Sequence, residues 1–229
     1  MPVNKENYQS IKKELDEKQV TLVAVSKTKP IADILELYHL GQRDFGENYV
    51  QELSDKALQL PGDIRWHFIG HLQTNKVKLI TSYVQLIHGV DSLKLLKEIN
   101  KEAEKNNRII DCLLQVHIAK EETKFGLDEV ELMTIMNETG NKEMDHIRIA
   151  GLMGMASFTE DMELVRNEFQ QLKVLFDKLI TPGNILDKIG PGPYRLPVLS
   201  MGMSSDYVVA VEEGSTLVRI GSLLFGERV

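Results

Sequence analysis

The sequence predicts a closed (β/α)8 barrel preceded by one extra helix. Short apolar stretches alternate with helix-like stretches about eight times along the chain. Parallel strands need crossover helices, and a regular strand–helix alternation favours a closed ring of strands. The 229 residues, 42% of them hydrophobic, suffice for one such core, so we expect a single domain over residues 1–229. An open doubly wound sheet is the alternative.

The first half of the chain supplies the clearest periodic patterns. Ile11 and Leu15 are four residues apart among charges, which predicts a helix, and the apolar Leu22–Val25 predicts a strand buried on both faces. Pro30 suits a helix start, and Gly41 suits a helix end. The expected elements are helix Tyr8–Lys18, strand Leu22–Val25, helix Ile31–Leu40, strand Arg43–Gly46, helix Tyr49–Gln59, strand Arg65–Ile69, helix Leu72–Ile80 and strand Val84–His88.

The second half continues the alternation. Asp91 or Ser92 can cap the next helix, and the residues Thr181–Pro197 carry turn signals that suggest a lid. The expected elements are helix Leu93–Asn106, strand Ile109–Ile118, helix Glu129–Asn137, strand Ile147–Leu152, helix Met162–Ile180, strand Leu196–Leu199, helix Asp206–Val211, strand Thr216–Ile220 and a short helix after Gly221.

Composition excludes several classes of protein. The net charge of −7 argues against a general nucleic-acid or anionic-membrane surface. Cys112 is the only cysteine, so the chain has no internal disulfide and no thiolate metal cluster. The polar amino-terminal residues have no hydrophobic signal region, and no apolar run approaches the ~20 residues of a membrane span. We expect a soluble cytoplasmic protein.

Lys27 follows the first expected strand, where α/β proteins place their ligands. A partly desolvated amine has a lowered pKa and acts as a nucleophile toward aldehydes. Lys29 is a competing candidate, and an ordinary loop cation is the alternative reading for Lys27.

Small hydroxyl residues and an arginine follow the last two expected strands. Ser204 and Ser205 lie at a helix start, and Arg219 precedes Gly221 and Ser222. Barrels often bind phosphate with these two loops, and an arginine adds a permanent positive charge. The alternative is that the serines only cap a helix and that Arg219 pairs with a carboxylate.

A phosphate site facing a lysine suggests a phosphorylated aldehyde, and pyridoxal 5'-phosphate satisfies both ends. Asn48, after the second strand, could bond a ring hydroxyl or cap a helix. His67 and His71 are four residues apart, but they lie on an expected strand and loop, so we interpret them as structural and predict no metal site. Four methionines are expected to line the pocket: Met153, Met155, Met201 and Met203.

The chain resembles the pyridoxal phosphate homeostasis proteins, also called the proline synthase co-transcribed family. The motifs that carry the resemblance run through most of the chain. They are AVSKTKP (Ala24–Pro30), FGENYVQE (Phe45–Glu52), WHFIGHLQTNK (Trp66–Lys76), GLMGM (Gly151–Met155), LSMGMSSDY (Leu199–Tyr207) and RIGSLLFG (Arg219–Gly226).

The resemblance implies a TIM barrel like the N-terminal domain of alanine racemase, with pyridoxal phosphate as a Schiff base on Lys27. It implies phosphate contacts from Ser204, Ser205, Gly221 and Ser222, with Arg219 and Asn48 near the cofactor. Members of this family are cofactor carriers or regulators that affect vitamin B6 and amino-acid balance, without an established reaction.

Three functions therefore remain open at this point. The first is a cofactor-binding homeostasis protein, expected to be a monomer that contacts apo-enzymes transiently and binds neither nucleic acid nor membrane. The second is a pyridoxal-phosphate-dependent racemase or lyase, for which Tyr207 and His67 are the first candidate bases. The third is a Schiff-base aldolase acting on a sugar phosphate.

Overall fold

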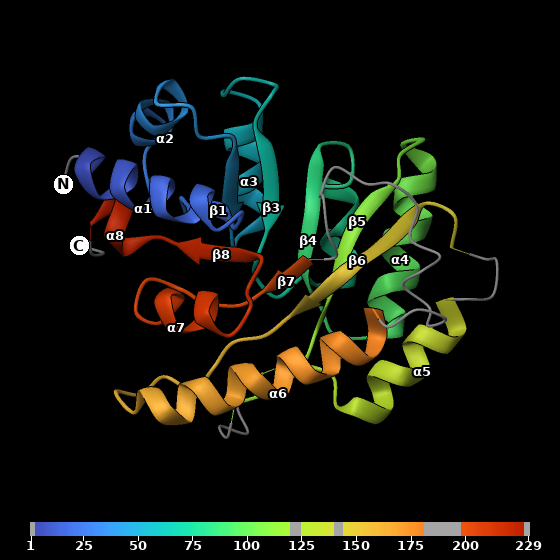
Figure 1. The fold of residues 1–229 in the computed structure, drawn as a ribbon. Coiled ribbons are helices and arrows are strands. Elements are labelled where there is room, and N and C mark those ends of the chain that lie inside the picture. Colours follow the sequence, from blue (N-terminus) through green and yellow to red (C-terminus); the bar gives the residue numbers. More distant parts are fainter. Residues whose placement is uncertain (1–2, 120–124, 140–143, 181–197, 227–229) are drawn as a thin grey trace.

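The computed structural model describes residues 3–119, 125–139, 144–180 and 198–226. Eight parallel strands form a closed barrel in chain order, and the first strand pairs with the last, Thr21 opposite Leu217 (Figure 1). The predicted (β/α)8 barrel is confirmed. Its strands are β1 (Thr21–Val25), β2 (Asp44–Glu47), β3 (Arg65–Phe68), β4 (Val84–Val90), β5 (Ile110–Gln115), β6 (Ile147–Met153), β7 (Val198–Ser200) and β8 (Leu217–Ile220).

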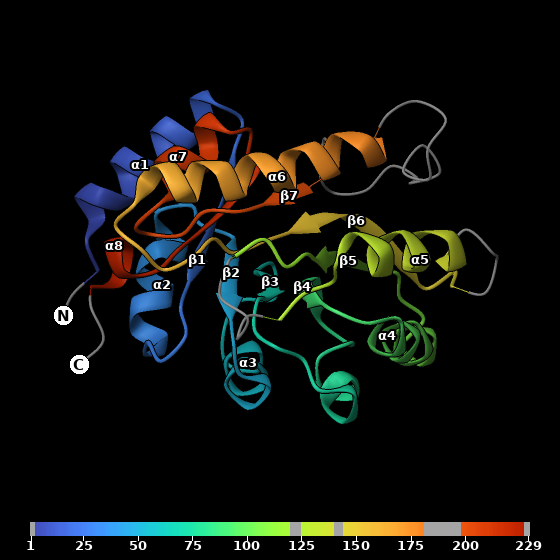
Figure 2. The ribbon, with the colours of Figure 1, turned by 90° about the horizontal axis from the view of Figure 1, so that it is seen from below.

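Helices surround the ring of strands (Figure 2). The predicted extra helix precedes β1, and a further short helix follows β8. The helices are α1 (Lys5–Glu17), α2 (Ile31–His39), α3 (Val50–Ala57), α4 (Leu93–Lys105), α5 (Glu129–Thr139), α6 (Met162–Ile180), α7 (Tyr207–Glu212) and α8 (Ser222–Phe225), with the 3-10 helix η1 (Thr74–Leu79) between β3 and β4.

Alternation along the strands divides the hydrophobic residues into two groups. Leu22 and Ala24 point outward into the large core between strands and helices, whereas Val23 belongs to a smaller cluster inside the ring. Removing this apolar surface from water, at about 25 cal/mol per Å², is the main contribution to the stability of the fold. The inner cluster comprises Val23, Leu86, Leu113, Ala150, Met153, Val198 and Leu217.

The largest local difference from the sequence prediction lies between β3 and β4. We expected a helix over Leu72–Ile80, but the chain forms the 3-10 helix η1 instead. Only Val77 of η1 is buried, so the segment lacks the continuous apolar stripe that stabilises an α-helix. Of the two candidate caps of α4, Ser92 is the one used, because its hydroxyl accepts a hydrogen bond from the amide of Leu95.

Helices α1 and α8 lie side by side, so the two ends of the described chain meet (Figure 1). The backbone amide of Asn4 donates to the carbonyl of Leu224, and the side-chain amide of Asn7 donates to the carbonyl of Leu223. The predicted lid over Thr181–Pro197 lies outside the described residues. No helix among those described is long and apolar enough to cross a membrane.

Candidate functional site

A cavity of about 520 Å³ opens among the loops that follow several barrel strands. Its volume lies within the range of roughly 300–1,000 Å³ that is usual for small-molecule sites. Most of the wall comes from the loops after β1, β6, β7 and β8, so residues distant in sequence meet here. The lining residues are Val25, Lys27, Lys29, Asn48, Ile69, Met155, Phe158, Met203, Ser204, Ser205, Arg219, Gly221, Ser222, Leu223 and Gly226.

The cavity wall carries positive charge only. Three lining residues are cationic, namely Lys27, Lys29 and Arg219, and none of the described lining residues is a carboxylate. Such a wall attracts an anion, because each cation is partly removed from water and the anion replaces the lost solvation. All seven residues predicted for the site from the sequence line this cavity.

Lys27 directly follows Ser26, which is fixed from both its side chain and its backbone. The Ser26 hydroxyl donates to Oε1 of Glu47 at 2.6 Å, and the Ser26 carbonyl accepts from Nζ of Lys56 at 2.8 Å. Lys56 and Glu47 form a buried ion pair with the same 2.8 Å separation. Burial raises the pKa of Glu47, although the Lys56 charge opposes that shift.

The residue after Lys27 is held in an unusual backbone conformation. Thr28 has a φ of 63°, a conformation that costs a threonine about 1–3 kcal/mol and persists only where surrounding contacts offset that cost. Its amide donates to Oε1 of Glu52 at 2.6 Å, and that carboxylate also accepts from Lys56 at 2.7 Å. The buried Lys56 therefore fixes the backbone on both sides of Lys27.

Lys29 has structural partners at the end of α8. Its ammonium group donates to the carbonyl of Phe225 at 2.9 Å and to the carbonyl of Gly226 at 3.3 Å. These carbonyls lie at the end of α8, where a cation is favourable. Lys29 therefore joins the β1–α2 loop to α8.

The two loops predicted to bind phosphate contact each other directly. Oγ of Ser204 accepts a hydrogen bond of 3.2 Å from the amide of Gly221, and Asp206 accepts one from the amide of Met203. Ser205 and Ser222 line the cavity beside them. Their hydroxyls can donate to an anion without a change in the fold.

Arg219 forms the floor of the cavity and is almost completely buried. Its Nη1 donates to the carbonyl of Ser200 at 3.0 Å and to the hydroxyl at 2.5 Å, and its Nη2 donates to the carbonyl of Gly154 at 3.2 Å. Burial lowers the pKa of Arg219 to about 10, and the charge of Asp206 opposes that shift, so the guanidinium remains cationic at neutral pH.

Asn48 presents a buried polar atom in the cavity wall. Its Oδ1 has no hydrogen-bond partner among the residues that the structure describes. Gly70 packs against its backbone so closely that an added Cβ would lie 2.4 Å from the carbonyl oxygen of Asn48. Because a buried polar atom without a partner is costly, Asn48 suits a ligand that supplies one.

Several candidates from the sequence lie elsewhere. His67 is not at a strand end but inside the barrel, completely buried and hydrogen-bonded to Asp44 and His88, as expected of a structural histidine. Tyr207 lies next to Glu14 of α1, and burial together with the charge and hydrogen bond of Glu14 raises the pKa of Tyr207. His71 pairs with Asp91 at 3.2 Å.

Of the four methionines, only Met155 and Met203 line the cavity, while Met153 and Met201 pack in hydrophobic clusters. No group of three or more metal-ligating side chains occurs within the described ranges.

Sequence reasoning missed three kinds of residue. Lys56 sits on a helix and resembles a solvated charge in the sequence, yet it is buried beneath the Lys27 loop. Phe158 lines the cavity although 89% of its surface is exposed, and nothing in its local sequence indicates that position. His88 lies within an apolar strand. Its presence at an inward-facing strand position is the feature of the sequence from which its role could have been suspected.

Comparisons with known proteins agree with this geometry. A model of the family "Alanine racemase, N-terminal domain" matches residues 4–229. A pyridoxal phosphate homeostasis protein of Aquifex aeolicus is 44% identical over 208 residues, which cover 90% of this chain and 86% of that protein. The human protein of the same name is 41% identical over 220 residues, which cover 92% of this chain and 77% of the human one.

Solved structures extend the comparison to the fold. PipY of Synechococcus elongatus PCC7942, solved with PLP bound, has a TM-score of 0.82 and 35% identity, covering 96% of this chain and 99% of PipY. Alanine racemase of Corynebacterium glutamicum has a TM-score of 0.63 at 14% identity, covering 91% of this chain and 57% of the racemase. The likeness to the racemase shows the barrel fold alone.

Proposed function

The chain belongs to the alanine racemase N-terminal domain family and, within it, to the pyridoxal phosphate homeostasis proteins, and from this premise we propose that it binds pyridoxal 5'-phosphate. Lys27 holds the cofactor as a Schiff base, and the protein serves intracellular vitamin B6 homeostasis as a carrier or regulator. The observation that carries the proposal is the cavity wall: a lysine, a buried arginine and three serines around one space, without a carboxylate among the described lining residues.

The residues of the cavity fit both ends of this cofactor. Ser204, Ser205 and Ser222 can donate hydrogen bonds to the phosphate, beside the close backbone of Gly221. Asn48 and Arg219 remain for the ring. The buried Oδ1 of Asn48 supports a polar ligand at that side of the cavity.

The chain's own contribution to the chemistry is the placement of one amine. The Nζ of Lys27 condenses with the aldehyde carbon, and water leaves. Because Lys56 fixes the backbone on both sides of Lys27, the amine loses little further freedom on reaction. A Schiff base is reversible in water, which suits a protein that takes up and releases its cofactor to apo-enzymes.

A carrier is favoured over a racemase or lyase by what the cavity lacks. Those reactions need an acid–base group besides the lysine that holds the cofactor. Among the described lining residues there is no histidine, tyrosine, cysteine or carboxylate, and Lys29 is bonded to two carbonyls of α8. The candidate bases Tyr207 and His67 do not line the cavity.

The test is trapping with borohydride. Wild-type protein mixed with pyridoxal 5'-phosphate and reduced should yield one labelled peptide, containing Lys27, and an absorbance change that Lys27→Ala abolishes. Lys29→Met is the matched control and should keep the label. Absence of a Lys27 adduct in the wild type would refute the proposal. Rapid, stereospecific exchange of the α-hydrogen of an amino acid in deuterated water would favour the racemase instead.

A further inference from the structure

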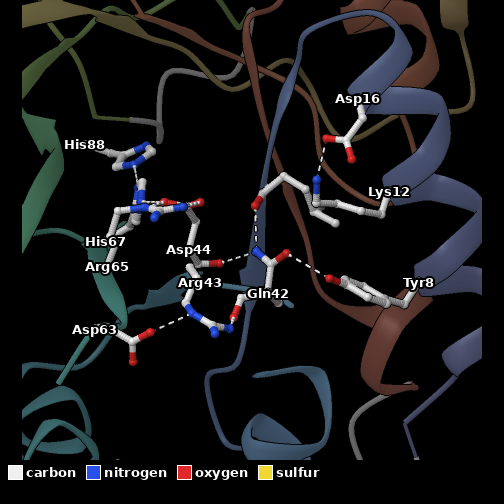
Figure 3. Close-up of polar contacts among 11 residues, drawn as sticks. Tyr8, Lys12, Asp16, Gln42, Arg43, Asp44, Asp63, Arg65, His67 and His88 are labelled. Carbon is white, nitrogen blue, oxygen red and sulfur yellow. Dashed lines mark hydrogen bonds and ion pairs between the residues drawn. The ribbon is translucent and has the colours of Figure 1, made fainter. Parts of the chain in front are cut away.

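A column of polar side chains runs through the interior of the barrel to the floor of the cavity. Asp44 Oδ1 lies 3.1 Å from Nε2 of His67, and Nδ1 of His67 lies 2.9 Å from Nε2 of His88. Nδ1 of His88 lies 3.1 Å from Oγ of Ser200, which accepts from Arg219 at 2.5 Å. Figure 3 shows the end of this column that contains Asp44. We call Asp44, His67, His88 and Ser200 the polar column.

Every member of the polar column is more than nine-tenths buried. Burying two imidazoles and a carboxylate is costly, so the column would not persist for packing alone. Aliphatic side chains fill the rest of the barrel interior, including Leu86 and Leu113. The proposed cofactor site does not include the column, and Arg219 connects the two because it lines the cavity and donates to Ser200.

The donor and acceptor groups at its two ends require all hydrogen bonds of the polar column to point in one direction. Arg219 can only donate, so Oγ of Ser200 accepts from it and sends its single hydrogen to Nδ1 of His88. His88 then carries its proton on Nε2 and donates to Nδ1 of His67, which in turn donates from Nε2 to Asp44. A carboxylate can only accept, so both ends of the column require the same direction.

The far end of the column is held by its own ion pair. Arg65 donates to Asp44 from Nε at 2.7 Å and from Nη2 at 2.5 Å (Figure 3). The other charges facing the two imidazoles are Arg219 above and Asp111 beside His67, the latter paired with Arg148. Asp44 thus remains an ionised acceptor at the end opposite the cavity.

From this geometry we infer that Asp44, His67, His88 and Ser200 are positioning residues that fix the orientation of Arg219 in the cavity floor. Asp44 acts at a distance: it selects the tautomer of His67, His67 selects that of His88, and His88 keeps the Ser200 oxygen available to the guanidinium. The same logic holds wherever a carboxylate fixes the tautomer of a working histidine. The inference deepens the proposed function, since Arg219 lines the proposed cofactor site.

The first experiment needs no ligand. Nitrogen-15 NMR of ligand-free protein should show His67 and His88 both protonated on Nε2 and unprotonated on Nδ1. In Asp44→Asn, whose amide can donate, the Nδ1-protonated form of His67 should appear. An Nδ1-protonated ring in the wild type would overturn the inferred direction, and an unchanged spectrum in Asp44→Asn would overturn the role of Asp44.

The second experiment is a double-mutant cycle on the affinity for pyridoxal 5'-phosphate. Ser200→Ala should weaken binding about tenfold, and Asp44→Asn about threefold, as loss of hydrogen bonds to charged groups would produce. The double variant should bind no more weakly than Ser200→Ala, because the column is already broken. Multiplication of the two effects to about thirtyfold would mean independent sites and would overturn the inference.

Two further variants keep this result interpretable. Ile99→Val changes the core between strands and helices, outside the barrel interior, and its effect should multiply with that of Ser200→Ala. If Asp44→Asn does not fold, His67→Gln takes its place in the cycle with the same expected pattern. A wild type that does not bind pyridoxal 5'-phosphate would refute the proposed function, while the NMR experiment would still decide the inference.

Discussion

The two mouths of the barrel both contain charged side chains, but they use them in opposite ways. At the amino-terminal mouth, Asp44 pairs with Arg65 and Asp111 pairs with Arg148, so each charge has a partner of opposite sign. At the other mouth, Lys27 and Arg219 face a cavity whose described lining contains no carboxylate. The comparison shows that ion pairs stabilise one mouth, whereas the described lining of the cavity at the other mouth carries cationic side chains and no carboxylate.

The strongest way to break this contrast is to unpair a charge beside the cavity. Lys56→Met leaves Glu47 completely buried without its cation, which should lower the free energy of unfolding by about 3–5 kcal/mol. Urea unfolding measures this loss. Lys12→Met, which removes an exposed pair with Asp16, is the control and should change stability by less than about 1 kcal/mol. Equal losses in both variants would contradict the burial argument.

The stability of the protein should depend on pH because of the buried His88 in the polar column. Burial, His67 and Arg219 hold the pKa of His88 well below its usual range, so below about pH 6.5 the unfolded chain binds the proton that the folded one excludes. Stability should therefore fall with decreasing pH, by up to about 1.4 kcal/mol per pH unit from this group.

Urea unfolding between pH 7.5 and 5.5 measures this slope. His88→Gln should flatten it, and His39→Gln, which replaces an exposed histidine, should leave it unchanged. A wild-type slope that persists in His88→Gln would assign the effect to other groups.

A smaller effect, on cofactor affinity, is expected from the hydroxyl of Ser204 in the cavity. Ser204→Ala removes a cavity hydroxyl and the acceptor for the Gly221 amide, so the affinity for pyridoxal 5'-phosphate should fall about tenfold, or ~1.4 kcal/mol. Fluorescence titration measures the dissociation constant. Ser54→Ala, whose hydroxyl bonds a helix carbonyl, should bind normally. Identical affinity in Ser204→Ala and wild type would remove Ser204 from the proposed site.

The smallest effect is expected at the amino-terminal mouth. Burial raises the pKa of Asp111 despite Arg148, which means that the carboxylate is held there at a cost. Because Arg148 keeps 21% of its side chain exposed, the cation left in Asp111→Asn stays in contact with water, and the free energy of unfolding should change by about 1 kcal/mol or less with cofactor affinity unchanged. A loss above about 3 kcal/mol in thermal or urea unfolding would show that this pair is a major source of stability.

The barrel could be predicted from the sequence because the apolar spacing within each element and the regular alternation of strands and helices indicate the same fold. Strand Leu22–Val25 and helix Met162–Ile180 are clear from apolar spacing alone, and their positions are confirmed. Residues at strand ends, such as Lys27 and Arg219, were predictable as neighbours because parallel strands end on one face.

The remaining features depend on packing that no local pattern encodes. Lys56 differs from a surface lysine through its bonds to Glu47 on a neighbouring strand and to the carbonyl of Ser26, and no local pattern indicates these partners. His67 and His88 look like unrelated residues of two strands until the ring closes and brings their imidazoles together. The α-helix expected over Leu72–Ile80 was a wrong prediction, because only Val77 of η1 is buried and no continuous apolar stripe forms.

Ring closure between β1 and β8 also has a consequence for synthesis on the ribosome. Thr21 is made long before its partner Leu217, because the two residues lie far apart in the sequence. Lys27, which follows β1, and Arg219 of β8 therefore meet only after β8 has been made, and nascent chains lacking β8 have no complete cavity. Contacts so distant in sequence make folding slow, so the growing polypeptide exposes the β1 edge for most of its translation time.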